Sequence, residues 1–226
     1  MRINEIRLQI PTKILDDWQK IVNLLSRITS VPAALIMRLD GSHIEVFVSS
    51  ESKNNPYRFG QKEKLQDSGL YCEEVIKSGN KLLVPNALED EKWKNNPDVE
   101  LGLVSYLGFP IFLPNQAPFG TICVLDSKRN AYSEDVENLM ITFRNLIESN
   151  IETVFMNQIL GDENKRISDY LDEIQVFRGI VTICSYCKSI KDSENKWRPI
   201  EEFLVKHPKA DFSHGICPKK KKKIHH

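Results

Sequence analysis

Two pairs of β-rich apolar runs, each joined by turn-forming residues, constrain the fold of this chain most strongly. The first pair covers residues 35–39 and 44–49, with Asp40 and Gly41 between them. The second pair lies in VSYLGFPIFLP and FGTICVLD and is divided by the turn-forming NQAP. Short runs rich in β-branched and aromatic residues, bounded by turn residues, are typical of β-hairpins. The sequence therefore predicts two hairpins.

Helical patterns flank the two hairpins. Apolar residues recur at three- and four-residue steps from Ile14 to Ile28, which is the stripe of an amphipathic helix. Ser133 stands where a helix N-cap is expected, and an apolar stripe follows it. Between the hairpins we expect a short helix over residues 71–77, a brief strand in KLLVPNA and two long polar connections. This order of elements predicts an α+β fold.

The apolar stripe of the second helix continues beyond the expected core, through Ile167 and Leu171. A helix with such a stripe must bury it, and the simplest partner is a second copy in a parallel coiled coil. The sequence therefore predicts a homodimer. In the alternative, the helix ends at Leu160, because Gly161 costs about 1 kcal/mol of helix propensity relative to alanine.

Charge and composition exclude several classes of function. The 226-residue chain has 31 lysines and arginines and 31 aspartates and glutamates, so no net charge attracts nucleic acid or an anionic membrane. The first twenty residues carry charges throughout and contain no signal peptide or membrane span. Five cysteines are too few for a secreted disulfide framework. We therefore expect a cytoplasmic protein.

The amino-acid sequence of several segments resembles that of the GAF domain of bacterial signalling proteins. The resemblance covers about residues 14–160 and is carried by LYCEEVIKSGNKLLVPNALEDEKWKNNPDV, SYLGFPIF, FGTICVLD and YSEDVENLM. It implies a central antiparallel β-sheet with the N- and C-terminal helices packed together on one face. On the other face it implies a pocket for a small-molecule ligand that the sequence does not identify. The expected domains are a GAF domain at 1–160, a helical or coiled-coil linker at 161–178 and a small module at 179–226.

By position in the GAF fold, nine residues are expected to line the ligand pocket: Phe47, Tyr57, Phe59, Tyr71, Val75, Asn86, Trp93, Tyr106 and Phe109. Trp93, in a polar loop, is the strongest of these candidates. The alternative is that most of them are core residues, because aromatic side chains dominate ordinary cores. Cys72 and Cys123 invite comparison with the bilin-attaching and sulfoxide-reducing branches of the family. An isolated cysteine is more often a small buried hydrophobe.

The segment from Ile183 to the C-terminus resembles a short module that follows sensory and receiver domains. It begins with ICSYCKSIKD and contains FSHGICP, but Lys220 replaces the final cysteine of the pattern. Zinc takes four ligands in a tetrahedron. The expected zinc ligands are Cys184, Cys187 and Cys217, with His214 as the fourth or, alternatively, one of the two terminal histidines. The other interpretations are a redox pair and simple packing residues.

These patterns lead to a non-enzymatic sensory function. The sequence contains no glycine-rich phosphate loop, kinase motif, metal-protease motif or nucleophile elbow. We expect a GAF domain that binds a small molecule and signals through a dimerising helix to a histidine kinase or response regulator. The alternative is a thiol- or metal-responsive switch that uses Cys184, Cys187 and Cys217, with the GAF fold as a dimerisation scaffold. Neither nucleic acid nor a membrane is an expected partner.

Overall fold

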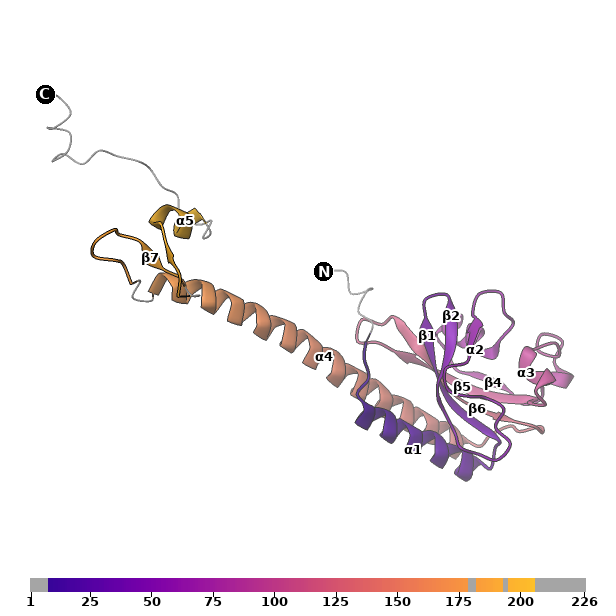
Figure 1. Cartoon of the computed structure of the whole chain (residues 1–226). Helices are drawn as coiled ribbons and strands as arrows, with labels where there is room; N and C mark the ends of the chain where they lie inside the picture. Colours follow the sequence, from indigo (N-terminus) through magenta and orange to yellow (C-terminus); the bar gives the residue numbers. More distant parts are fainter. Residues whose placement is uncertain (1–7, 179–181, 193–194, 206–226) are drawn as a thin grey trace, which may run out of the picture. The chain divides into compact units, whose positions relative to one another are not determined.

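The structure, a computed structural model, describes residues 8–178, 182–192 and 195–205 (Figure 1). The chain divides into two compact units, residues 1–161 and 162–226. The division falls within one long helix. No helix in the described part of the chain is both long and apolar enough to cross a membrane.

The first unit contains the predicted helices and hairpins. Its elements are α1 (Thr12–Thr29), β1 (Ala33–Asp40), β2 (His43–Ser49), β3 (Lys62–Lys64), α2 (Tyr71–Ser78), β4 (Leu82–Val84), the 3-10 turn η2 (Ala87–Glu89), α3 (Pro97–Glu100), β5 (Ser105–Phe112), β6 (Pro118–Asp126) and the beginning of α4 (Glu134–Arg178). The expected hairpins are β1–β2 and β5–β6. The strand β3 was not predicted, because its three residues are all charged and exposed.

The six strands form one antiparallel sheet in the order β3-β2-β1-β6-β5-β4. The two hairpins are joined through β1 and β6, where Leu35 lies opposite Cys123 and Ile36 lies opposite Ile122. Because successive side chains in a strand point to opposite faces, the first pair faces one side of the sheet and the second pair faces the other. Both faces are therefore buried at the centre of the sheet.

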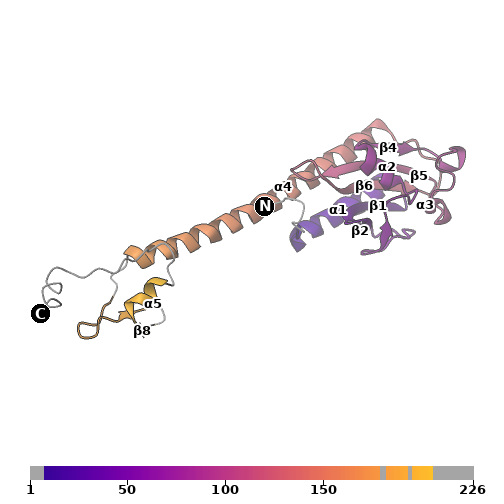
Figure 2. The same cartoon turned by 90° about the horizontal axis from the view of Figure 1, so that it is seen from above.

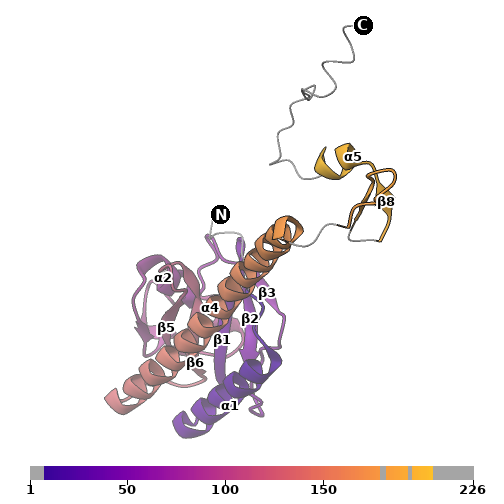
Figure 3. The same ribbon diagram turned by 90° about the vertical axis from the view of Figure 1, so that its left-hand side faces the viewer.

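Helices α1 and α4 lie beside each other on one face of the sheet (Figures 2 and 3). Trp18 of α1 is fully buried there, and its ring makes edge contacts with Phe47 and Phe119, each with centroids 6.1 Å apart. Its indole Nε1 donates a hydrogen bond of 3.0 Å to Oδ1 of Asn150 on α4. One side chain thus joins both helices to the sheet. The α+β fold expected from the sequence is confirmed.

A β-bulge in β2 changes which residues face the helices. Met37 pairs with Val46 and Ile36 pairs with Val48, so Phe47 is the extra residue between them. Phe47 and Val48 both pack in the core beneath α1, whereas Val46 and Met37 belong to the core on the opposite face. The bulge therefore places Phe47 beside Trp18.

Helix α4 begins where the sequence predicted. The Ser133 Oγ accepts a hydrogen bond of 3.4 Å from the backbone amide of Val136. The helix continues through Gly161 to Arg178, so the alternative in which it ends at Leu160 is wrong. Glycine weakens a helix by a small amount only, and the favourable residues around it outweigh that amount.

The second unit contains, besides the end of α4, a two-stranded hairpin and a short helix. These are β7 (Ile190–Lys191), β8 (Trp197–Arg198) and α5 (Ile200–Val205). Ile190 is buried, and the Arg198 guanidinium pairs with the Asp192 carboxylate at 2.5 Å. A small folded module therefore follows the long helix.

Replacing Asn150 should weaken the first unit. In Asn150→Ala the buried indole N–H of Trp18 loses its acceptor, which should lower the free energy of unfolding by about 1–3 kcal/mol. Asn157→Ala is the matched control, because Asn157 is exposed on the same helix. Urea unfolding followed by circular dichroism measures both. An equal effect of the two substitutions would contradict the proposed importance of this hydrogen bond.

Candidate ligand-binding site

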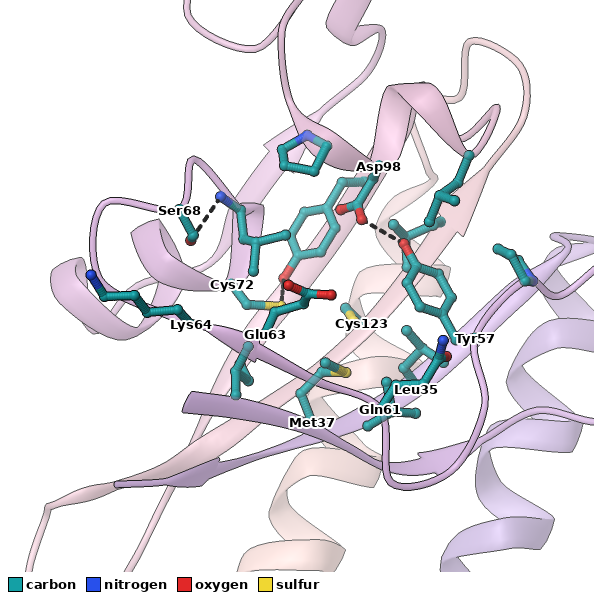
Figure 4. A pocket seen from close by; sticks show the side chains of 18 of the residues that line it. Leu35, Met37, Tyr57, Gln61, Glu63, Lys64, Ser68, Cys72, Asp98 and Cys123 are labelled. Carbon is teal, nitrogen blue, oxygen red and sulfur yellow. Dashed lines mark hydrogen bonds between the residues drawn. The ribbon is translucent and has the colours of Figure 1, made fainter. Parts of the chain in front are cut away.

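A cavity of about 560 Å³ lies on the face of the sheet opposite α1 and α4 (Figure 4). Its floor is apolar and comes from the strands, mainly Leu35 and Met37 of β1, Ile44 and Val46 of β2, and Leu125 of β6. These residues share a face because alternate positions of neighbouring strands point the same way. The walls come from α2, β3, α3 and the loop before β3. The sheet thus provides an apolar base, and the polar connections close over it.

Asp98 of α3 is the most deeply buried acidic side chain in this cavity. It is 8% exposed, and its Oδ1 accepts a hydrogen bond of 2.6 Å from the Tyr57 hydroxyl. The preceding Asn96 accepts from the Asp98 amide and donates to the carbonyl of Gly69 before α2. This pair of bonds ties α3 to the α2 loop. Asp98 is therefore held in a defined position.

Tyr57 reaches Asp98 from a loop that is equally well held. Its amide donates to Oδ1 of Asn55, a buried residue whose side-chain nitrogen donates to the Ser50 carbonyl at 2.7 Å. Ser49 Oγ donates to the Tyr57 carbonyl. The loop after β2 is thereby fixed without regular secondary structure. Both members of the Tyr57–Asp98 pair are preorganised by backbone hydrogen bonds.

Burial and nearby groups change the acidity of this pair. Burial raises the pKa of Asp98 to about 6, the Tyr57 hydrogen bond opposes this, and the charge of Glu63 adds to it. Burial and the Asp98 charge raise the pKa of Tyr57 far above its usual value, so its hydroxyl remains a donor. Within the described residues, no hydrogen-bond partner of Asp98 Oδ2 is present. That oxygen is left available to the cavity.

Two buried cysteines also face the cavity. Cys72 Sγ lies 3.6 Å from the Tyr106 hydroxyl and 3.4 Å from Thr121 Oγ1. Interaction with the neighbouring Cys123 thiol holds the pKa of Cys72 below its usual value, and the same interaction together with burial raises the pKa of Cys123. The ring of Tyr106 passes over Gly108, where a Cβ would meet the Tyr106 hydroxyl at 2.1 Å. Glycine therefore leaves the space that Tyr106 needs.

The structure places the nine predicted pocket residues in several different environments. Tyr57 and Tyr106 line the cavity. Phe47 and Phe109 pack in the core beneath the helices on the other face, so their expected position is wrong. For Phe109 the reason is strand periodicity, because it is three residues from Tyr106 and must face the opposite way.

The other five predicted residues do not line the cavity. Tyr71, Val75 and Trp93 are buried in the core beside it, and Tyr71 stacks on Tyr106 with ring centroids 4.7 Å apart. Phe59 is 71% exposed. Asn86 instead caps η2 by accepting a hydrogen bond from the Leu88 amide. Tyr71, Val75 and Trp93 are thus buried in the core next to the cavity and not among the residues that line it.

Sequence reasoning missed Asp98, since acidic residues in polar loops usually face solvent. One signal was present in the sequence, namely the Asn-Pro-Asp run at residues 96–98. Asparagine followed by proline is typical of a helix start, with asparagine as the N-cap and proline at the first position. That pattern fixes the start of the short helix but does not show that Asp98, its second residue, is buried.

Cys184 and Cys187 of the second unit lie in a tight turn. Lys188 adopts φ 63°, and its amide donates to the Cys184 carbonyl at 3.0 Å. Hydrogen bonds with Ser189, and a further one with Cys184, lower the pKa of Cys187 to about 7. No group of three or more histidine, cysteine or acidic side chains able to hold a metal occurs among the residues that are described. The predicted ligands His214 and Cys217 lie outside those residues.

Comparisons with solved structures support the fold. The chain is similar to the GAF domain of a phosphoenolpyruvate-protein phosphotransferase from Acinetobacter, with 18% identity over 66% of this chain and 86% of that chain and a TM-score of 0.51. It is also similar to the GAF domain region of a putative membrane protein from Geobacter sulfurreducens PCA, with 17% identity over 63% and 95% of the two chains and a TM-score of 0.53. A third similar structure is the type II free methionine-R-sulfoxide reductase from Thermoplasma acidophilum, with 13% identity over 65% and 97% and a TM-score of 0.51.

At these identities the similarity extends to the fold alone. A search of curated proteins finds no match. The GAF domain model matches residues 16–151, which is more than half of the chain and includes the sheet, the cavity and the start of α4. The match and the fold agree, and the chain belongs to the GAF domain family.

Proposed function

We propose that this protein is a non-enzymatic, cytoplasmic sensory module whose GAF cavity binds a small molecule. The observation that carries this proposal is a preorganised, buried carboxylate in an apolar cavity, with one oxygen that has no partner among the described side chains. Small-molecule sites are concave and mostly apolar, with a few convergent polar groups that orient the ligand. The floor of the cavity and the Tyr57–Asp98 pair have this composition.

The burial of Asp98 supports a binding role rather than a structural one. A carboxylate with a raised pKa is destabilised by its surroundings, and residues of this kind gather at functional sites. A ligand group that pairs with Asp98 Oδ2 would relieve this destabilisation. The binding free energy would then stabilise the arrangement of α3 and the loop after β2 that the Tyr57–Asp98 hydrogen bond joins.

Helix α4 is the proposed transmission element. Leu160 and Ile167 are 59% and 51% exposed, and Met156 and Tyr170 are half exposed beside them. These four apolar residues, at 156, 160, 167 and 170, fall on the four- and three-residue spacings of a coiled-coil seam, and Glu163 occupies the position between Leu160 and Ile167. We infer that a second copy of the chain covers this seam in parallel. A histidine kinase or response regulator is the proposed recipient of the signal.

If the cavity binds a small molecule, a large side chain at the cavity entrance should prevent that binding. Native mass spectrometry of the purified chain should detect a bound mass that is lost on denaturation. Leu101→Trp should remove that mass, because Leu101 lies at the rim of the cavity and is 52% exposed. Leu88→Trp is the control, since Leu88 is 60% exposed and does not line the cavity. A bound mass that persists in Leu101→Trp would contradict binding at this site.

The seam proposal predicts that two charges abolish dimerisation. Light scattering after size exclusion should give a dimer for the native chain and a monomer for the double variant Leu160→Asp, Ile167→Asp. The control is Gln158→Asp with Lys165→Asp, at exposed positions on the opposite side of the heptad. If both double variants remain dimeric, the seam is not the interface.

A thiol- or metal-responsive switch in the second unit is a second candidate. It is favoured by the exposed Cys187 thiol, whose pKa of about 7 leaves much of it as the metal-binding and reactive thiolate at neutral pH. Cys184 and Cys187 fit half of a four-ligand zinc site, and zinc bound there would fix the module structurally.

Elemental analysis of the purified chain tests the zinc proposal. We expect about one zinc ion per chain. The double variant Cys184→Ser, Cys187→Ser should lose it, whereas Cys72→Ser should keep it because Cys72 is buried in the first unit. A native chain purified without chelators that contains no zinc and takes up none on titration would exclude the zinc site.

A further inference from the structure

We propose that the cavity selects a small cationic amine with an apolar body, whose ammonium group pairs with Asp98 Oδ2 beside Glu63. This inference rests on the proposed ligand-binding function and specifies the ligand class. It follows from three features of the cavity. These are the donor and acceptor roles of the Tyr57–Asp98 pair, which we call the anchor, the signs of the charges that line the cavity, and the apolar residues of its floor.

The anchor accepts hydrogen bonds and has no free donor. The Tyr57 hydroxyl already donates to Asp98 Oδ1 at 2.6 Å, so its proton is engaged. A carboxylate accepts only, and Oδ2 has no partner within the described part of the protein. A ligand that reaches this oxygen must therefore present a donor. Ammonium provides three donors, and a charge-assisted hydrogen bond to a carboxylate is about twice as strong as a neutral one.

The charges lining the cavity favour a cation. Asp98, Glu63 and Asp67 line it, and Lys64 is its one cationic lining residue among those described. The charge of Glu63 raises the pKa of Asp98, so the two carboxylates repel each other in the ligand-free state. Figure 4 shows both side chains directed into the same cavity. A positive charge between them removes this repulsion, whereas an anion adds to it.

The floor determines the rest of the ligand. Leu35, Met37 and Leu125 present apolar surface, and the Tyr106 ring closes one side. Burial of apolar surface contributes binding free energy, and the polar end pairs with the buried carboxylate. A volume of about 560 Å³ accommodates a bicyclic ring with a short aminoalkyl chain. An aryl-alkylamine therefore matches both ends of the cavity.

Tryptamine and two analogues of similar shape test the sign of the selected charge. Isothermal titration of the full chain at pH 7.5 compares tryptamine with neutral 3-ethylindole and anionic indole-3-propionate. Tryptamine should bind at least about tenfold more tightly than 3-ethylindole, and indole-3-propionate should bind most weakly. Asp98→Asn should weaken tryptamine by at least about tenfold and leave 3-ethylindole unchanged. Asp162→Asn, on the exposed surface of α4, is the matched control and should change neither affinity.

The affinity for tryptamine should also fall at acidic pH. Asp98 has a pKa of about 6, so it accepts as a carboxylate above that pH and becomes a neutral acid below it. The ammonium group of tryptamine stays charged throughout, as that of lysine does. Affinity should therefore decline by nearly tenfold per pH unit below 6, and Asp98→Asn should lose this dependence. The titratable groups that face Asp98 or line the same cavity are Tyr57, Glu63, Lys64, Asp67, Tyr71, Cys72, Tyr106 and Cys123.

The outcomes separate this inference from the proposed function. Equal binding of tryptamine and 3-ethylindole, or an Asp98→Asn variant that keeps full affinity for tryptamine, would overturn the amine selectivity. If Leu101→Trp then abolished that binding, the cavity would remain a ligand site of another class. Failure of all three probes would also overturn the amine inference, and the bound mass in native spectra would still test the proposed function separately.

Discussion

The packing of Trp18 between two helices and the sheet is the contact on which the rest of the first unit depends. Its ring fills the space between Phe47 and Phe119, and its N–H donates a hydrogen bond to the side chain of Asn150. A large aromatic side chain contributes much apolar burial, and its single polar atom requires a partner. Because Asn150 provides that partner, the position of α4 along α1 is fixed. The opposite face of the sheet is then free to form a cavity.

The face of the sheet opposite α1 and α4 combines well-packed aromatic residues and firmly held loops with one destabilising buried charge. Tyr71, Tyr106 and Trp93 form an aromatic cluster next to the cavity, and the loops are held by buried asparagines such as Asn55 and Asn96. Against this rigid background, Asp98 is a destabilising residue because its charge is buried with one neutral hydrogen-bond donor. A destabilising buried charge that is held in one defined position is typical of functional sites. A ligand that binds there gains free energy that the folded protein alone lacks.

Periodicity in the sequence predicted α1, the two hairpins and the start of α4 because each has a long, regular apolar pattern. It did not predict β3, which has no apolar residue, or the bulge at Phe47, which depends on pairing between strands. Phe109 was assigned to the wrong face. It lies three positions after Tyr106, and side chains at that spacing in a strand point to opposite faces of the sheet. Asp98 could not be predicted because its burial results from contacts with Tyr57, which lies 41 positions earlier.

The acidity of Asp98 in the ligand-free chain is the property on which the proposed ligand site depends most directly. A carbon-13 NMR titration of its side-chain carboxyl group reports the protonation of this residue alone. We expect a midpoint at a pH of about 6, because burial and Glu63 disfavour the charged form. A midpoint near the usual value of 3.8 would mean that water or a cation already stabilises the carboxylate, and it would contradict a buried anchor awaiting a ligand.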